Sequence, residues 1–508
     1  MSKEQAFERA ARTFTDGSFE RELARRVAVP SVSGPGADDA PLMAYFETIL
    51  QPDLESMGFT CAYLPNPIAG QSPFLLAERI ESPDALTVLS YGHGDVVPGY
   101  DDQWEAGLSP WTLTLRDGAW YGRGIADNKG QHTINFAALR AVLDARHGKL
   151  GYNVKALFEL GEERSSPGLR EVCAQHRDAL SANVFIASDG PRVSIDEPTI
   201  FLGSRGSLVF ELSCNLREGG LHSGNWGGIM KNPAVLLANA IGTLVDGRGR
   251  IVIDGLLPPP IPDSVRAVLA KLTVDSKSLG KRIDDDWGEP GLTAAERLLG
   301  WNTLEVLTLH AGNPAKPVNA IPPSASAHVQ LRFVVGTNWR EAESLLRAHL
   351  DQAGYTDINV KIVRGSPATR LDPASPWVTW VKDAIAQATG AEPSVVPNLG
   401  GTVPNDAFSE ILGLPTIWVP HSYPGCKQHA ANEHLPLNIV QQGLRMMTSV
   451  FWELGEAPAQ AAWREATTHA TSQAATQSAT QATKQAAMQS ATQATKQAAT
   501  SSATQSTT

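Results

Sequence analysis

Histidine and carboxylate residues in five short motifs are the part of this sequence whose types and spacing could do chemistry. Imidazole and carboxylate ligands together suit Zn²⁺, and Mn²⁺ or Co²⁺ are also possible. Two neighbouring metal ions need a bridging ligand, and such a pair polarises an amide carbonyl and lowers the pKa of bound water. A carboxylate that binds no metal can then act as the base. The residues that stand out are His93, Asp127, Glu162, Glu163, Asp189 and His429.

Each motif taken alone also has a simpler interpretation. His93 and Asp95 alternate along an extended segment, so one could bind a metal while the other accepts the remaining ring N–H. A lone His-x-Asp is more commonly a surface loop, and His429 alone would be an ordinary loop histidine. Asp127 could simply cap a helix, the paired glutamates could form a solvated turn, and Asp189 could belong to an Asp-Gly-Pro turn. Their joint occurrence at successive strand ends makes coincidence a poor explanation.

The elements that must position these residues alternate between strand and helix. Apolar runs at 85–90, 154–160 and 183–187 predict buried strands, and the apolar face of residues 134–147 predicts a helix between the first two. Strands separated by helices predict an α/β fold with a largely parallel central sheet. Ligands of such sheets collect at the carboxyl ends of the strands, which is where the acidic motifs lie.

A second region interrupts this alternation. Its closing part predicts strands at 328–335 and 358–363, after which helix 376–389 and strand 415–420 resume the first pattern. The chain should therefore leave one domain, build a second and return, which brings His429 back beside the early motifs. We expect a catalytic domain at 1–198 and 367–458, an inserted domain at 199–366, and a low-complexity, disordered tail at 459–508.

Composition favours a small-molecule partner. The 508 residues carry a formal charge of −11, with a pI near 5.6. Nucleic acids and anionic membranes both require a basic surface, so neither is expected as a partner. The four cysteines form no CxxC pair, and the N-terminus lacks the apolar core of a signal peptide. No apolar run approaches the roughly 18 residues of a membrane span, so a cytoplasmic protein is expected.

The motifs, taken in order, resemble those of a known family. They are GHGDVVP at 92–98, YGRGIADNKG at 121–130, ELGEE at 159–163, ASDG at 187–190 and QHAANEH at 428–434. This order is similar to that of the co-catalytic zinc metallopeptidases, which include carnosinase and related cytosolic dipeptidases, aminoacylase, succinyl-diaminopimelate desuccinylase and bacterial glutamate carboxypeptidase. The resemblance covers about residues 20 to 455. It implies a zinc-peptidase-like catalytic domain and an inserted α+β lid and dimerisation domain.

The resemblance also implies roles for the residues of the site. Glu162 would be the general base and proton shuttle, Asp95 would orient His93, and the Asp127–Asn128 peptide bond would be cis. Many relatives carry a second aspartate where this chain has Asn128, a departure that leaves the ligand set intact. The implied ligands are His93, Asp127 and Asp189 for one divalent ion, and Asp127, Glu163 and His429 for the other, with zinc as the leading metal.

Four further residues match positions that contact the substrate in the family. His222 is similar to the histidine that reaches the site of the partner subunit and stabilises the tetrahedral oxyanion. Asn319 and Arg332 match positions that hold the backbone or carboxylate of the substrate, and Gly401 lies where relatives often carry a substrate-facing loop. Without the other motifs these would be a surface histidine, a turn asparagine and a strand-edge arginine.

The expected activity is hydrolysis of an amide bond in a dipeptide or an N-acyl amino acid by a homodimeric metallopeptidase. The segments HSGNWGG and LVDGRGRIVIDGLLPP, together with the insertion before Asn319, favour the carnosinase-like branch. One alternative is the same site acting on a nonpeptide amide, a carbamoyl group or an aromatic amine. Another is an inactive metal-binding or peptide-binding homologue, which would be expected to lose Glu162 or a ligand, whereas this chain retains them all.

Overall fold

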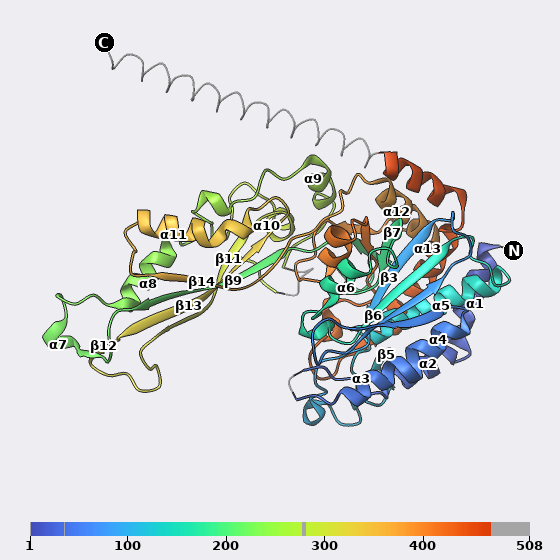
Figure 1. The fold of residues 1–508 in the computed structure, drawn as a ribbon, viewed down its shortest axis with the longest axis horizontal. Coiled ribbons are helices and arrows are strands. Elements are labelled where there is room, and N and C mark those ends of the chain that lie inside the picture. The colour runs from blue at the N-terminus through green and yellow to red at the C-terminus, as the bar shows by residue number, and fades with distance from the viewer. Residues whose placement is uncertain (1, 35, 277–280, 469–508) are drawn as a thin grey trace, which may run out of the picture.

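The computed structural model describes residues 2–34, 36–276 and 281–468. Figure 1 shows two lobes, a large α/β domain that contains the N-terminus and an elongated domain that projects away from it. The chain builds part of the large domain, then the elongated domain, and then completes the large one. No helix among the described residues is long and apolar enough to cross a membrane.

An eight-stranded sheet forms the centre of the large domain. In spatial order its strands are β1 (Thr60–Leu64), β2 (Phe74–Arg79), β6 (Asn153–Glu159), β3 (Thr87–His93), β7 (Val184–Ala187), β16 (Thr416–Trp418), β8 (Thr199–Phe201) and β15 (Ser394–Val396). The four strands from β6 to β16 are mutually parallel, which confirms the predicted, largely parallel sheet. Antiparallel pairs occur only toward the two edges of this sheet.

Helices cover both faces of the large sheet, so its strands are apolar on both sides. In β6, Val154, Ala156 and Phe158 contact one helical layer, whereas Leu157 contacts the other. The first layer includes α1 (Lys3–Thr15), α2 (Ser18–Val27), α5 (Lys129–Ala145), α12 (Pro376–Thr389) and α13 (Leu437–Glu453). The second contains α6 (Leu169–Gln175), α9 (Asp263–Leu269) and α10 (Ala294–Leu299).

The elongated domain is built on a four-stranded antiparallel sheet. Its strands, in spatial order, are β11 (Thr303–Ala311), β13 (Ser324–Phe333), β9 (Gly206–Asn215) and β14 (Asn359–Ser366). The helices α8 (Pro233–Gly242) and α11 (Ala342–Gln352) pack on one face. In β13, Val329, Leu331 and Phe333 are buried beneath them, so the alternating residues Gln330 and Arg332 belong to the opposite face.

The inserted domain begins later than the predicted residue 199. Residues 199–201 form β8, which belongs to the large sheet and pairs with β15 and β16. The inserted sheet starts only with β9, which residues 202–205 separate from β8. No helix separates these two strands, so the strand-like pattern runs on across the true boundary. The helices α9 and α10, which lie within the insertion, also pack on the large domain.

The expected disordered tail is wrong for its first ten residues. Residues 459–468 are helical, and the side chains of Ala459 and Ala462 are buried in the core of the large domain. Alanine at these positions lets the helix pack closely. The composition of residues 459–468 is nevertheless similar to that of the repetitive sequence that follows. The remainder of the predicted tail, 469–508, lies outside the described residues.

Smaller elements complete the two domains. At the far end of the elongated domain, β10 (Leu221–His222) pairs with β12 (Ala320–Ile321) beside the short helix α7 (Ser223–Trp226). In the large domain β17 (His434–Pro436), β5 (Ala119–Tyr121) and β4 (Thr114–Arg116) form a three-stranded sheet. The helices α3 (Asp39–Tyr45) and α4 (Gln51–Ser56) precede β1.

Candidate metal centre and active site

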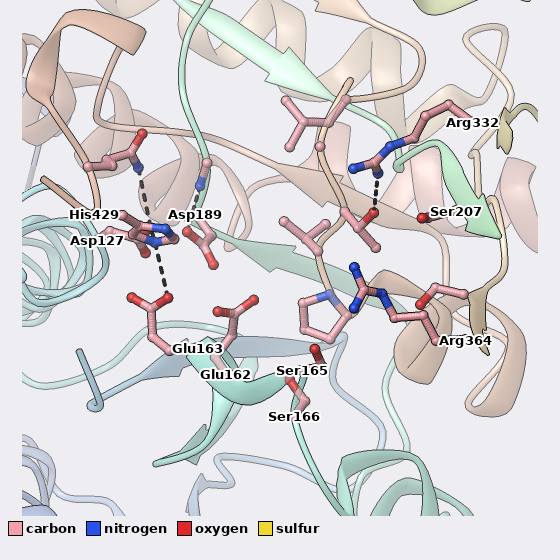
Figure 2. A pocket seen from close by; sticks show the side chains of 18 of the residues that line it. Asp127, Glu162, Glu163, Ser165, Ser166, Asp189, Ser207, Arg332, Arg364 and His429 are labelled. Carbon is pink, nitrogen blue, oxygen red and sulfur yellow. Dashed lines mark hydrogen bonds and ion pairs between the residues drawn. The ribbon is translucent and has the colours of Figure 1, made fainter. Parts of the chain in front are cut away.

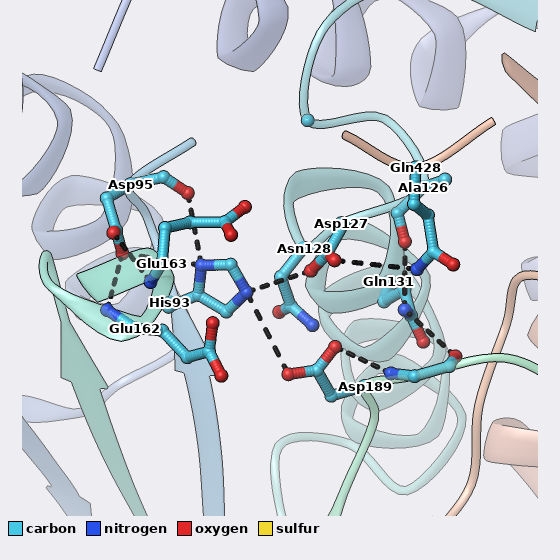
Figure 3. Close-up of polar contacts among 12 residues, drawn as sticks. His93, Asp95, Ala126, Asp127, Asn128, Gln131, Glu162, Glu163, Asp189 and Gln428 are labelled. Carbon is cyan, nitrogen blue, oxygen red and sulfur yellow. Dashed lines mark hydrogen bonds and ion pairs between the residues drawn. The ribbon is translucent and has the colours of Figure 1, made fainter. Parts of the chain in front are cut away.

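The carboxyl ends of three parallel strands bring the predicted residues to one edge of the large sheet. His93 is the last residue of β3, the pair Glu162-Glu163 follows β6 in a 3-10 turn, and Asp189 follows β7. Because β3 lies between β6 and β7 and runs parallel to both, these ends are neighbours. Figure 3 shows the side chains converging from these strand ends.

Asp127 reaches the same place from the loop before α5. Its peptide bond to Asn128 is cis, as the family resemblance implies. The side chain of Asn128 donates to the carbonyl oxygen of Ser188 at 2.8 Å, which connects this loop to the segment that carries Asp189. The start of α5 is packed closely, since a Cβ atom on Gly130 would lie 1.9 Å from the backbone oxygen of Ile125.

Two groups of potential ligand atoms share Asp127. Within each group the ligand atoms lie within 4.8 Å of one another. His93 Nε2 is 3.0 Å from Asp127 Oδ1 and 3.8 Å from an Asp189 oxygen. On the other side of Asp127, His429 Nε2 is 3.2 Å from Oδ2 and 3.0 Å from Glu163 Oε2. The two sets are the same as those that the family resemblance implies.

The donor set and its electrostatics fit divalent cations. Glu163 Oε1 is buried and has no hydrogen-bond partner among the described residues. Burial raises the pKa of Glu162 well above its ordinary value; His93 opposes this rise, while the neighbouring carboxylates add to it. Burial, followed by the charge of Asp127, raises the pKa of Asp189 to about 7. Positive charge placed among these carboxylates would therefore stabilise their ionised forms.

Asp95 connects the histidine of β3 to the glutamate pair. His93 Nδ1 lies 3.0 Å from the backbone carbonyl oxygen of Asp95 and 3.3 Å from one of its carboxylate oxygens, on the side of the ring that faces away from Asp127. The same carboxylate accepts hydrogen bonds from the backbone N–H groups of Glu162 and Glu163, each at 3.2 Å, and from the Ser33 hydroxyl at 2.6 Å. Asp95 can thus fix the ring orientation of His93 and the position of the turn that carries Glu162.

Glu433 holds the loop of Asp127, a role that its sequence motif does not predict. Its Oε1 accepts from the backbone N–H groups of Ala126 at 2.8 Å and Asp127 at 3.2 Å. Its Oε2 accepts from the N–H of Gly124 at 2.9 Å and from Arg123 Nη1 at 2.7 Å. Glu433 lies four residues after His429, within the motif QHAANEH. This buried carboxylate therefore connects the two chain segments that carry the bridging aspartate and the second histidine.

A cavity of about 630 Å³ separates this cluster from the elongated domain. Asp127, Glu162, Glu163, Asp189 and His429 line one side of it. The facing wall comes from the open face of the inserted sheet and from the loop around Gly401, as Figure 2 shows.

On that wall Arg332 Nη1 donates to the Thr402 hydroxyl at 3.0 Å. Two predicted substrate residues, Arg332 and Gly401, thus share a cavity with the potential metal ligands. Ser207 and Arg364 line it as well and were not predicted, because isolated strand residues form no motif.

His222 and Asn319 lie elsewhere. They belong to the far end of the elongated domain, where the N–H of Ser223 donates to the carbonyl oxygen of Asn319 at 3.0 Å. Neither residue lines the cavity of its own chain, and both side chains are exposed. One chain therefore assembles the potential ligands, Glu162, Arg332 and Gly401, but not these two residues.

Known proteins are similar to this chain in both sequence and fold. The sequence profile of peptidase family M20/M25/M40 matches residues 89–453. The chain is 28% identical over 416 residues to the Beta-Ala-His dipeptidase of Mus musculus, covering 76% of this chain and 80% of that protein. It is 27% identical over 486 residues to the Cys-Gly metallodipeptidase DUG1 of Candida albicans, covering 86% and 95%. The solved M20 family metallo-carboxypeptidase Sso-CP2 from Sulfolobus solfataricus is similar with a TM-score of 0.72 and 26% identity, covering 86% of this chain and 99% of that one.

Proposed function

The chain belongs to peptidase family M20/M25/M40 and is a metallopeptidase that hydrolyses C–N bonds, and we propose that its substrates are dipeptides. The observation that carries this proposal is the cavity between the two domains. Its inner side holds two groups of potential ligands that share Asp127, with Glu162 beside them, and its outer side presents Arg332. A short peptide can place its amide at the first side and its carboxylate at the second.

Two divalent ions per chain, most of all zinc, are the proposed cofactors. His93, Asp127 and Asp189 would hold one ion, and Asp127, Glu163 and His429 would hold the other. Bound there, the ions would polarise the scissile carbonyl and acidify water. The mixed imidazole and carboxylate ligands suit zinc best, although manganese and cobalt accept the same donors.

The chain's own residues would then carry the proton and orient the substrate. Glu162 takes a proton from the attacking water and returns it to the leaving amine, and burial of its carboxyl group favours holding that proton. Asp95 keeps the His93 ring and the Glu162 turn in place. Arg332 binds the substrate carboxylate through its planar, two-pronged guanidinium. Gly401, in the loop beside it, leaves room for the substrate backbone.

A homodimer would supply the remaining donors. In this proposal His222 and Asn319 act in the cavity of the partner subunit, where the imidazole stabilises the oxyanion. The end of the elongated domain that carries them has large apolar side chains on its surface, including Trp226, Ile229 and Val318, and Ile229 is 74% exposed. Apolar patches of this kind mark protein interfaces. The cytoplasm is the proposed location, since all four cysteines are unpaired.

The first experiment measures metal content and hydrolysis on the same protein. Elemental analysis should give about two divalent ions per chain, and a panel of dipeptides and N-acyl amino acids should identify the cleaved class. Glu162→Gln should lower kcat by about 10²–10⁴-fold while metal content stays at two, because Glu162 is proposed as the base and binds no metal. Glu171→Gln, the same exchange on the exposed surface of α6, is the matched control.

The outcomes separate the candidate functions. Two ions without cleavage of any dipeptide would move the proposal to the nonpeptide amides, and loss of metal in Glu162→Gln would refute its role as base. A protein that takes up no metal after reconstitution would contradict the proposed centre. An inactive binding homologue is not favoured, because every potential ligand and Glu162 are present in this chain.

A further inference from the structure

A second arginine, Arg364, faces the cavity beside Arg332. Arg332 lies on β13 and Arg364 on β14, with β9 between the two strands. Both line the cavity, and Figure 2 shows both guanidinium groups projecting into it from the side opposite the carboxylate cluster. Burial, and next the charge of Arg364, lower the pKa of Arg332, so the two positive groups are close enough to influence one another.

Neither arginine has an acidic partner among the described residues. In the described part of the chain no ion pair involves Arg332 or Arg364, and the hydrogen bond of the Arg332 side chain goes to the neutral Thr402 hydroxyl. Arg170, which also lines the cavity, contrasts with them because it is paired with Asp406. Two like charges side by side without a counterion destabilise each other, and a dianionic ligand would relieve that repulsion.

The strands of the inserted sheet add further polar residues to this wall, whereas the loop around Gly401 adds the apolar Val403 and Pro404. Ser207 pairs in register with Arg332 on one side and with Ser366 on the other. All three residues line the cavity, as does Gln330, whose side-chain amide donates to the Ser207 hydroxyl at 3.0 Å. On the strand side of the wall, carboxylate oxygens therefore find guanidinium and hydroxyl donors.

We propose that Arg364 determines specificity for substrates whose C-terminal residue carries an acidic side chain. This inference rests on the proposed dipeptidase function and deepens it. Arg332 binds the main-chain carboxylate, and Arg364 binds the second carboxylate of a C-terminal aspartate or glutamate. Both arginines lie on the wall opposite the potential metal ligands, so a substrate whose two carboxylates they hold has its amide bond on the side of those ligands.

Kinetics with matched dipeptides test the proposal. The metal-loaded protein should hydrolyse Ala-Glu with a kcat/KM about tenfold above that for its neutral isostere Ala-Gln, and further above Ala-Leu. In Arg364→Gln the ratio of Ala-Glu to Ala-Gln should fall to about one. Arg364→Glu should reverse the preference toward Ala-Lys. Because Arg364 is exposed, the Ala-Glu preference of the wild-type protein should also decrease as NaCl is added.

Lys361→Gln is the control, because it removes the same charge from the same strand at an exposed residue that does not line the cavity. It should leave the rates for Ala-Glu, Ala-Gln and Ala-Leu and their ratios unchanged. An equal loss for every substrate in Arg364→Gln, or a wild-type ratio near one, would overturn the inference while the dipeptidase function stands. If the metal-loaded protein cleaves no dipeptide at all, the proposed function fails and this inference fails with it.

Discussion

At the scale of single residues, the site depends on carboxylates that bind no ion as much as on the potential ligands. Glu433 is buried, and it accepts hydrogen bonds from the backbone N–H groups of Gly124, Ala126 and Asp127 and from the side chain of Arg123. Each of its carboxylate oxygens accepts two hydrogen bonds. An amide in its place would present one N–H₂ group to donors that need an acceptor, leaving buried N–H groups unpaired.

Glu433→Gln should therefore weaken metal binding by about 10–100-fold without unfolding the protein. The reason is that the loop of Asp127 would lose its fixed position while every ligand remains. Metal titration followed by spectroscopy or calorimetry measures the affinity, and kcat at saturating metal should recover most of its wild-type value. Such recovery distinguishes a positioning residue from a catalytic one.

The matched control is Glu296→Gln. Glu296 is likewise buried and paired with an arginine, Arg266, but it lies in the capping box of α10, away from the cavity. Its exchange should lower the melting temperature and leave metal affinity unchanged. If Glu433→Gln binds metal as tightly as the wild type, the positioning role is wrong.

The sequence could identify the residues of the site only where their signal is local. His93, Asp127 and Asp189 each lie in a short motif at a strand or helix end, and the structure places them together. Glu433 was part of such a motif, yet its partners are backbone N–H groups about 300 residues earlier in the chain, which no local pattern encodes. Arg364 had no motif at all, because its significance comes from the pairing of β14 with β9.

At the scale of elements, the start of α5 is packed closely against the loop that precedes it. Gly130 is its second residue, and a Cβ atom there would meet the backbone oxygen of Ile125 at 1.9 Å. Unlike the far end of a flexible side chain, a backbone atom cannot move aside without shifting its neighbours. The neighbours in this case include the loop that carries Asp127.

Gly130→Ala should lower the free energy of unfolding by about 1–3 kcal/mol and also reduce metal affinity. Both effects have the same cause, since the displaced helix start moves Asp127 away from the two histidines. Gly242→Ala is the control, because Gly242 also lies in a helix, α8, and a Cβ atom there meets nothing within 4 Å. It should leave stability unchanged or slightly higher. Denaturant unfolding and metal titration of both variants measure these effects. If the two variants have the same stability and the same metal affinity, close packing at Gly130 does not position Asp127.

Elements with a clear hydrophobic period and with residues that begin or end a helix or strand could be predicted from the sequence. Elements without these signals could not. The predicted helix at 376–389 has the bounds of α12, because proline begins it and glycine follows it. The domain boundary at 199 was missed because β8 and β9 share one continuous strand pattern although they belong to different sheets. The helix at 459–468 was missed because burial of Ala459 depends on tertiary packing that composition does not reveal.

At the scale of the whole molecule, the proposed site residues are divided between two distant parts of the chain. This division favours a homodimer. The large domain contains the potential ligands and the base, whereas His222 and Asn319 lie at the far end of the elongated domain. If His222 acts in the cavity of a partner, each cavity of a homodimer combines Glu162 from one subunit with His222 from the other. A monomer would then contain every required residue and still be a poor catalyst.

Mixing two impaired variants tests this arrangement. Glu162→Gln and His222→Ala should each be nearly inactive as homodimers, since one lacks the base and the other lacks the oxyanion donor. In a mixed dimer, one cavity contains the Glu162 of the His222→Ala subunit and the His222 of the Glu162→Gln subunit, so that cavity is complete. Co-expression of the two variants should therefore restore about a quarter of wild-type kcat, because random pairing makes half the dimers mixed and each of these has one complete site. Activity that stays at the level of the separate variants, in dimers shown to be mixed, would contradict catalysis across the interface, because a donor acting within its own chain cannot be supplied by the partner.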